Sequence, residues 1–306
     1  MKKRLTYFTP TYNRAKTLPK LYESLVNQTD KRFIWLVVDD GSKDNTSELI
    51  NKWIKENKIE IEYIYKNNGG KHTAIDLSNE VCKTEFINCI DSDDCVSLDS
   101  TEILYNYFEK ISNNDNICGI VGRRASFEGV PFNNSFPLNN ETLYFRELSE
   151  KYGYSQDTNL VFKTEIIKKY KFPQFENERF VTESVFYNRF LFDYKMFSIP
   201  ELLYLGEYQE DGYTVQGLRL FYKNPEGYLY ALKQNAYYSI KNNDSLKIKI
   251  ARATHFYSWK KALKLKEKYN QDYKLPLIFR IIGVVLSGMF IKKYKKGYQE
   301  FKSEKK

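Results

Sequence analysis

The chain carries an acidic run, Asp91-Ser92-Asp93-Asp94, directly after an apolar stretch that ends at Ile90. Carboxylate oxygens are hard ligands that suit Mg²⁺ or Mn²⁺, and such ions usually share their protein carboxylates with substrate phosphates. A metal ion here could bridge a diphosphate and neutralise the charge that develops as the diphosphate leaves. Alternatively, the run is a set of helix N-cap residues, a position that Asp and Ser favour.

Three more polar runs follow apolar stretches in the first part of the chain: Pro10-Thr11-Tyr12-Asn13, Asp39-Asp40-Gly41-Ser42 and Asn67-Asn68-Gly69-Gly70-Lys71. The carboxylates of the second run could accept hydrogen bonds from the base and the ribose of a nucleotide. Backbone N–H groups and the cation of the third run could face phosphate. Taken singly, each run also fits an ordinary turn between two elements.

Strand-like and helix-like stretches alternate over the first 125 residues. The expected strands are 5–9, 33–38, 59–65, 85–90 and 117–121, and the expected helices are 17–27, 44–56, 72–81 and 100–111. This alternation predicts an α/β fold with a mostly parallel sheet and helices on both faces. Because ligands bind outside the carboxyl ends of such strands, we expect the four polar runs to meet there. Their five carboxylates would repel one another, and a cation would relieve that repulsion.

The four runs together resemble glycosyltransferase family 2. They read T-P-T-Y-N-R at 9–14, V-V-D-D-G-S at 37–42, N-N-G-G-K-H at 67–72 and I-D-S-D-D at 90–94. The resemblance is strong over residues 4–125 and looser over 126–215. It implies inverting transferases with the Rossmann-like GT-A fold, of the type that builds bacterial surface polysaccharides. Residues 1–125 would then form the nucleotide-sugar-binding half, and residues 126–225 the acceptor-binding half.

The resemblance also implies roles for individual residues. Pro10 and Tyr12 would line the base pocket, Tyr12 by stacking, and Asp39 and Asp40 would hold the base or ribose. The donor would also meet Asn68, Gly70, Lys71, Asp91 and Ser92. Asp93 would be the main metal ligand, with Asp91 and Asp94 in support.

Inverting transfer needs a general base that deprotonates the acceptor hydroxyl. The family places this carboxylate in the second half, often at a helix start, and Glu183 fits, since it precedes the apolar stretch 184–192. Glu176 and Glu178 are alternatives on the preceding loop, and a helix N-terminal residue without a catalytic role is the other interpretation of Glu183. A second expected helix in this half spans 163–170.

The positive charge of the chain is concentrated at its C-terminal end. Residues 241–306 hold 18 Lys and Arg against 5 Asp and Glu, although the net charge of the whole chain is only +9. Residues 226–306 are expected to be a helical, basic extension, and the apolar stretch 277–291 is followed by Lys292, Lys293, Lys295 and Lys296. Two interpretations stay open: contact with the anionic inner leaflet of the cell membrane, or a helix packed on the catalytic domain.

Composition narrows the function classes further. The four cysteines have no CxxC spacing and the chain has 2 histidines, so we expect no zinc site and free thiols. The N-terminus does not read as a secretory signal, which favours the cytoplasm. Because the excess charge lies in one terminal segment, it does not predict a nucleic-acid partner.

The sequence therefore predicts a metal-dependent glycosyltransferase that moves a sugar from a nucleotide sugar, with a UDP-sugar favoured, to a glycan or lipid-linked acceptor. A nucleotidyltransferase acting on a sugar phosphate is the first alternative, although Thr9–Arg14 lacks the glycine-rich loop expected there. A non-catalytic scaffold that binds nucleotide sugars is the second.

Overall fold

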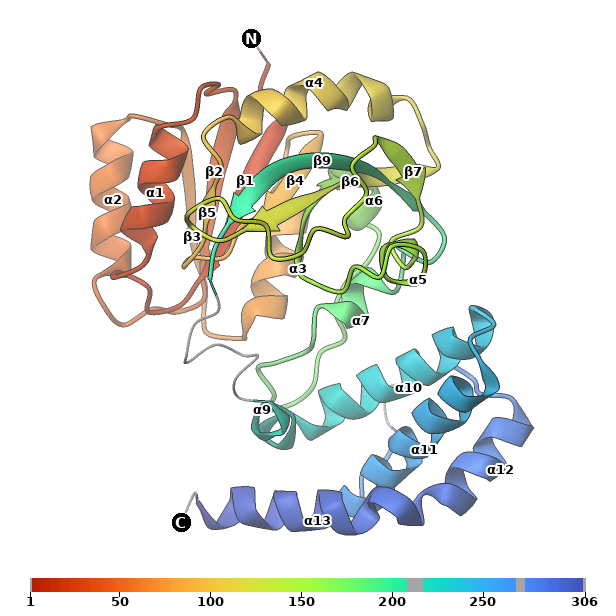
Figure 1. The fold of residues 1–306 in the computed structure, drawn as a ribbon. Helices are drawn as coiled ribbons and strands as arrows, with labels where there is room; N and C mark the ends of the chain where they lie inside the picture. The colour runs from red at the N-terminus through yellow and green to blue at the C-terminus, as the bar shows by residue number, and fades with distance from the viewer. Residues whose placement is uncertain (1, 208–216, 268–272, 305–306) are drawn as a thin grey trace. The chain divides into compact units, whose positions relative to one another are not determined.

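The computed structural model describes residues 2–207, 217–267 and 273–304, which fall into two compact units. Unit 1 comprises Met1–Lys171 and Arg189–Tyr208, and unit 2 comprises Phe172–Asn188 and Gln209–Lys306. Unit 1 is a sheet covered by helices, and unit 2 is built of helices (Figure 1).

The first half of unit 1 is a parallel α/β arrangement. Its strands lie in the order β3-β2-β1-β4, and all three pairings between them are parallel. The strands are β1 (Leu5–Thr11), β2 (Phe33–Asp39), β3 (Ile61–Tyr65) and β4 (Phe86–Cys89), and the connecting helices are α1 (Leu18–Val26), α2 (Thr46–Glu56) and α3 (Lys71–Val81). The chain runs outward from β1 to β3 and then returns to β4. Right-handed crossovers therefore put α1 and α2 on one face and α3 on the other.

The apolar stretches of the sequence form the core of this half. Every residue of β1 is buried, as expected for a central strand covered on both faces. Trp35 of β2 is fully buried beside Tyr22 of α1, whose ring stacks on that of Trp53 of α2 at 4.2 Å between centroids. The predicted elements of this half are confirmed, with ends that shift by a few residues.

Beyond β4 the sheet becomes mixed, so the expected parallel arrangement describes only its first half. β8 inserts between β4 and β6 and is antiparallel to both, whereas β6 and β9 are parallel. The antiparallel partners of β9 are β5 and β7. The elements are β5 (Cys95–Val96), α4 (Ser100–Ser112), β6 (Ile117–Ala125), β7 (Glu141–Leu143), α5 (Glu147–Glu150), β8 (Thr158–Lys163), α6 (Thr164–Ile167) and β9 (Lys195–Leu205).

The sequence analysis missed β8 because two of its buried residues are polar. Asn159 exchanges side-chain hydrogen bonds with Asn88 of β4 at 3.0 and 3.1 Å. Lys163 is 2% exposed, and its Nζ donates to the carbonyls of Ser112 and Asn114 at the end of α4. The helix expected over 163–170 is correspondingly wrong at its start, and it is reduced to the single turn of α6.

Unit 2 confirms the expected helical C-terminal extension. Its core is aromatic, with Trp259 stacked on Tyr222 at 5.1 Å and contacting Tyr228 and Tyr294 edge-on. The helices are α7 (Ser184–Tyr187), α9 (Leu218–Lys223), α10 (Pro225–Lys241), α11 (Leu246–Leu263), α12 (Leu277–Leu286) and α13 (Gly288–Ser303).

Two helix predictions in this part of the chain need correction. The helix expected over 184–192 ends after Tyr187, because from Arg189 on the chain belongs to unit 1, where Phe190 packs against Phe162. The apolar stretch 277–291 is divided at Ser287 into two helices. Within the described ranges, none of the helices has the length and apolar character needed to cross a membrane.

Candidate functional site

The loops that follow β1, β2, β3 and β4 meet at one edge of the sheet. The first N–H group beyond β2, β3 and β4 still donates to a carbonyl of the neighbouring strand. These bonds run from Asp40 to Thr11 at 2.8 Å, from Lys66 to Asp39 at 2.9 Å and from Ile90 to Phe8 at 2.8 Å. The first two loops are also joined, since the N–H of Asn13 donates to Oγ of Ser42 at 2.8 Å. The expected meeting of the four polar runs therefore occurs.

Asp40 anchors the loop that begins α3. Its Oδ1 accepts from Nζ of Lys66 at 2.5 Å and from the N–H of Gly69 at 2.8 Å, and its Oδ2 accepts from the N–H of Gly70 at 2.7 Å. Nδ2 of Asn68 donates to the carbonyl of Asp40 at 2.8 Å. Gly70 has φ 95°, a backbone conformation that favours glycine. Both carboxylate oxygens of Asp40 are thus engaged within the protein, and its position shapes the loop.

Asp39 is fully buried and holds two other elements of the edge. Its Oδ1 accepts from the N–H of Ser42 at 2.8 Å, and its Oδ2 accepts from the hydroxyl of Tyr63 on β3 at 2.8 Å. Burial, followed by this contact with a carboxylate, raises the pKa of Tyr63 to about 12. Asp39 and Asp40 therefore hold the loops that follow β2 and β3.

Lys71 links this loop to the acidic run. Its Nζ lies 2.6 Å from Oδ1 of Asp91, while the neighbouring Gly70 is bonded to Asp40. Asp40 and Asp91 consequently lie on the same edge, separated by the Gly70-Lys71 dipeptide. Burial by itself raises the pKa of Asp91, but the nearby cations, Lys71 first and then Arg124 and Arg14, together outweigh burial, so that the pKa is lowered.

The other two carboxylates of the run are pushed toward their neutral forms. Burial and then the Asp91 carboxylate raise the pKa of Asp93. Burial raises the pKa of Asp94 to about 7, against the opposing effect of the Arg124 guanidinium. The run is thus a site of crowded negative charge, the situation in which a bound cation stabilises ionised carboxylates. Across the described ranges, no three His, Cys, Asp or Glu side chains are already arranged to hold a metal ion.

Two residues that the sequence analysis missed hold Asp94 in place. Arg124, at the end of β6, lies 3.2 Å from Oδ1 of Asp94 and 3.0 Å from Oδ2 of Asp157. The hydroxyl of Tyr204 on β9 donates to Oδ2 of Asp94 at 2.6 Å and accepts from the N–H of Asp91 at 3.2 Å. A Cβ at Gly206 would lie 1.8 Å from Oδ1 of Asp94, so this position must stay glycine. The sequence signal for Arg124 was a charge three residues after the expected strand 117–121.

The remaining predicted donor contacts lie around the same edge. Pro10 pairs with Val38 of β2, but on its other side the pairing of β1 with β4 has already ended at Phe8. This position suits proline, because proline has no N–H group to donate to a neighbouring strand. Tyr12 is 43% exposed in the loop after β1. Ser92 is buried within the acidic run.

The three candidate general bases belong to unit 2 and differ in their surroundings. Oε2 of Glu183 accepts from the hydroxyl of Tyr187 at 2.9 Å, one turn along α7. Both oxygens of Glu178 accept backbone N–H groups at the start of α10, from Glu226 and Gly227, each at 2.7 Å. Burial raises the pKa of Glu178 to about 7. Glu178 therefore caps a helix, and Glu176 is exposed.

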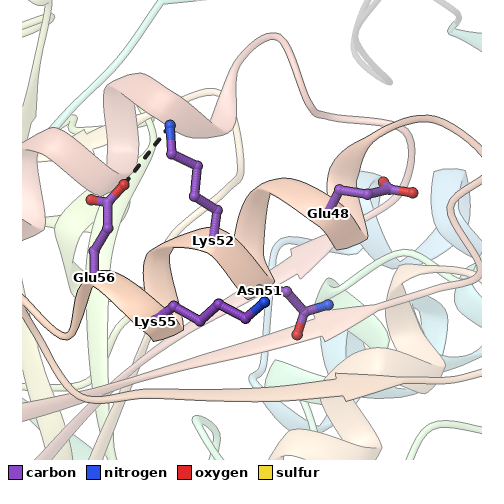
Figure 2. A pocket seen from close by; sticks show the side chains of 5 residues that line it. All are labelled: Glu48, Asn51, Lys52, Lys55 and Glu56. Carbon is purple, nitrogen blue, oxygen red and sulfur yellow. Dashed lines mark ion pairs between the residues drawn. The ribbon is translucent and has the colours of Figure 1, made fainter.

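A hollow elsewhere on unit 1 does not belong to this site. It lies along α2 and is bordered by the polar side chains of Glu48, Asn51, Lys52, Lys55 and Glu56 (Figure 2). Lys52 and Glu56 form an i,i+4 ion pair at 3.9 Å. Because the opposite side of α2 packs into the core through Ile50 and Trp53, this hollow is the solvated outer face of a helix.

Comparison with known proteins agrees with this architecture. A family model described as "Glycosyl transferase family 2" matches residues 6–171, more than half of the chain. TarP of Staphylococcus aureus, named a poly(ribitol-phosphate) beta-N-acetylglucosaminyltransferase, is 30% identical over 133 residues, which is 42% of this chain and 40% of TarP. GlyG, a glycosyltransferase of Streptococcus pneumoniae, is 31% identical over 111 residues, 36% of each chain. The chain spans about two fifths of the length of the curated relatives it matches.

Solved structures share the fold over nearly the whole chain. The crystal structure of S. aureus TarS 1–349 in complex with UDP-GlcNAc superposes with a TM-score of 0.62 and 15% identity, covering 99% of this chain and 92% of that one. The mannosyltransferase PcManGT of Pyrobaculum calidifontis, solved with GDP-Man and Mn²⁺, has a TM-score of 0.53 and 12% identity and covers 98% of this chain and 85% of that one. Identities this low establish the GT-A-like fold alone.

Proposed function

Because the chain belongs to glycosyl transferase family 2, we propose that it is an inverting transferase that passes a sugar from a UDP-sugar to a hydroxyl group of a glycan or lipid-linked acceptor in cell-surface polysaccharide synthesis. The observation that carries the proposal is the acidic run Asp91–Asp94, which lies beside Lys71 where four strand ends meet. The carboxylate oxygens of this run could bind a metal ion, and the neighbouring Lys71 ammonium could contact phosphate.

A nucleotide diphosphate sugar fits the order of groups along this edge. Tyr12 is exposed and able to stack on a base, and Pro10 lies beside it at the end of β1. Asp39 and Asp40 hold the two loops between which the base and ribose would lie. Asn68, Gly70 and Lys71 lead into α3, whose N-terminus favours anions, and the neighbouring Ser92 adds a hydroxyl on the acidic run. UDP is the favoured nucleotide because TarS was solved with UDP-GlcNAc.

A divalent metal ion, Mg²⁺ or Mn²⁺, suits the acidic run. Asp93 would be the main ligand, with Asp91 and Asp94 in support, and the bound ion would stabilise the charge on the departing diphosphate. The donor set fits, because burial and, less strongly, the neighbouring carboxylates raise the pKa of Asp93 and Asp94, and a bound cation would favour their ionised forms, whose hard oxygens suit these ions. Arg124 and Tyr204 would keep Asp94 in position.

Glu183 is the residue that we assign to proton removal from the acceptor hydroxyl. Its bond from Tyr187 fixes the side chain along the helix axis. Glu178 is a poorer candidate, since α10 already occupies both of its oxygens. An acceptor carried on a lipid would place the enzyme in the cytoplasm, at the inner face of the cell membrane.

Titration calorimetry with UDP, with and without Mn²⁺, tests this function. The unmodified chain should bind UDP more tightly with Mn²⁺, and Asp93→Asn should lose that gain. The exposed Asp115, replaced in Asp115→Asn, is the matched control and should behave as the unmodified chain. UDP binding without transfer from a UDP-sugar would favour a scaffold that binds nucleotide sugars, and turnover of a nucleoside triphosphate with release of pyrophosphate would favour nucleotidyl transfer. Absence of UDP binding would contradict the proposed function.

A further inference from the structure

One face of α12 is apolar and exposed. Its exposed apolar residues recur at the spacing of a single helix face, and Met289, the first exposed large apolar residue of α13, follows them. Their exposed fractions lie between 41% and 72% in the set Leu277, Ile278, Ile281, Val284, Val285 and Met289. We refer to these six residues as the α12 face. Five of the six lie within the ten residues of α12, and a contiguous exposed apolar patch commonly marks an interaction surface.

Packing against α11 determines which side of α12 is exposed. A Cβ at Gly283 would lie 2.5 Å from the Tyr257 ring and 3.0 Å from the carbonyl oxygen of Ala253, so the two helices approach closely there. Nζ of Lys261 on α11 donates to the carbonyl of Val284 at 3.0 Å and to Oγ of Ser287 at 2.8 Å. The α12 face is therefore held outward by contacts within unit 2, where α12 and α13 both pack on α11 (Figure 1).

Exposed lysines continue this surface along α13. Lys292, Lys293 and Lys296 follow Met289 by three, four and seven residues, so they share its side of the helix. Tyr294 lies on the other side, where it is 4% exposed and packs against Trp259. The surface thus combines an apolar band with a row of cations.

We propose that the α12 face and these three lysines dock on an anionic phospholipid bilayer, with α12 lying in the plane of the interface. The apolar side chains would enter the boundary between headgroups and acyl chains, and the lysines would meet lipid phosphates. A helix of ten residues is about 15 Å long, which is about half of the hydrocarbon thickness, so α12 is suited to lie in the surface. This inference does not depend on the identity of the sugar donor.

The charge pattern favours a lipid surface over a second copy of the chain. If two copies paired through the α12 face, the lysines of both α13 helices would be brought together and would repel one another. Residues 241–306 hold 18 basic and 5 acidic side chains, so two copies would also repel through the net charge of these segments. An anionic bilayer supplies the opposite charge and an apolar phase together.

Flotation of the full chain with vesicles tests the proposal. Vesicles of phosphatidylglycerol and phosphatidylcholine should bind the chain, pure phosphatidylcholine should bind it weakly, and high salt should reduce binding. Lys292→Gln/Lys293→Gln/Lys296→Gln should weaken binding by about 100-fold, since each cation contributes about fivefold. Ile281→Gln/Val285→Gln should also release the chain. Both variants alter exposed side chains, and circular dichroism would verify that they remain helical.

Matched controls lie on α2 in unit 1. Ile54 is 38% exposed, and Lys52 and Lys55 are exposed, so Ile54→Gln and Lys52→Gln/Lys55→Gln make the same kinds of substitution elsewhere, at one apolar residue and two lysines. Both controls should bind vesicles as the unmodified chain does. The proposal is overturned if the unmodified chain ignores anionic vesicles or if the controls lose binding equally. It is also overturned if the α12 face instead holds a dimer in size-exclusion chromatography, which Ile281→Gln/Val285→Gln would dissolve.

The two proposals can fail separately. Transfer to a water-soluble acceptor should persist in the α12 and α13 variants, because these helices lie in unit 2 and contribute none of the donor residues. Lost vesicle binding with retained UDP binding would therefore concern the docking surface alone.

Discussion

Replacing Arg124 should destabilise the protein by an amount that grows with pH. The Arg124 side chain is 11% exposed and pairs with Asp94, which is 5% exposed, so Arg124→Gln leaves a buried carboxyl without its cation. The pKa of Asp94 is already about 7, and it would rise further without the guanidinium. Below pH 7 the carboxyl is largely neutral in both proteins, and the loss comes mainly from hydrogen bonds and packing, about 2 kcal/mol.

Above pH 7 a further electrostatic loss appears. The folded wild-type protein gains about 1.4 kcal/mol per pH unit from ionising Asp94 above its pKa, and the variant does not, which adds about 2 kcal/mol by pH 8.5. In the variant, Asp94 stays protonated in the folded state but ionised in the unfolded state over a wider range of pH. Its free energy of unfolding therefore falls with pH from about 4 to beyond 8, whereas in the wild type this fall ends near pH 7.

Urea unfolding at pH 6, 7 and 8.5 without divalent ions would measure this difference. A double-mutant cycle with Asp94→Asn is the control, because the pH-dependent part must vanish when residue 94 cannot ionise. A loss for Arg124→Gln that is independent of pH would refute the reasoning, as would the same pH dependence in the Asp94→Asn background.

Three further predictions concern other parts of the molecule. Asp40→Asn should lower the free energy of unfolding by about 3 kcal/mol, because it leaves the Lys66 ammonium without its carboxylate partner. It should also weaken UDP binding, and an unchanged melting temperature and UDP affinity by calorimetry would contradict this prediction. Glu183→Gln should reduce transfer by about 100-fold or more with unchanged donor binding, whereas Glu178→Gln should lower the melting temperature and spare turnover; the reverse pattern would exchange their roles. Burial and then Lys293 lower the pKa of His255 from 6.5 in the folded protein. As the pH drops below about 6.5, this histidine is therefore protonated more readily in the unfolded chain, and the free energy of unfolding should fall. Thermal melts of His255→Phe, which should be less sensitive to pH in that range, would check the last prediction.

The sequence was most informative where an element and its ligand-facing end are adjacent in the chain. The run at 39–42 begins at the last residue of β2, and the run at 91–94 directly follows Ile90, so a parallel sheet alone brings them to one edge. Their roles within the protein were less predictable. The hydrogen bonds that Asp40 accepts from the N–H groups of Gly69 and Gly70 depend on the shape of a loop about thirty residues away in the sequence.

The rest of the site depends on contacts that no local pattern encodes. Arg124 and Tyr204 reach Asp94 only because β8 enters the sheet between β4 and β6 and β9 then returns to β5. β8 itself carries a buried lysine that serves α4, which hides the strand from a hydropathy pattern. Long-range pairing, and not residue type, decides these positions.

The ion pair between Lys71 and Asp91 has a consequence for the order of events at the edge of the sheet. A divalent ion and the Lys71 ammonium would compete for the same carboxylate oxygen, because Nζ of Lys71 already lies 2.6 Å from Oδ1 of Asp91. A donor diphosphate would give that lysine a new partner and would leave Asp91 available to the ion. Binding of the metal ion would therefore make binding of the donor more favourable, and the reverse. By thermodynamic linkage, the two effects should be equal in free energy.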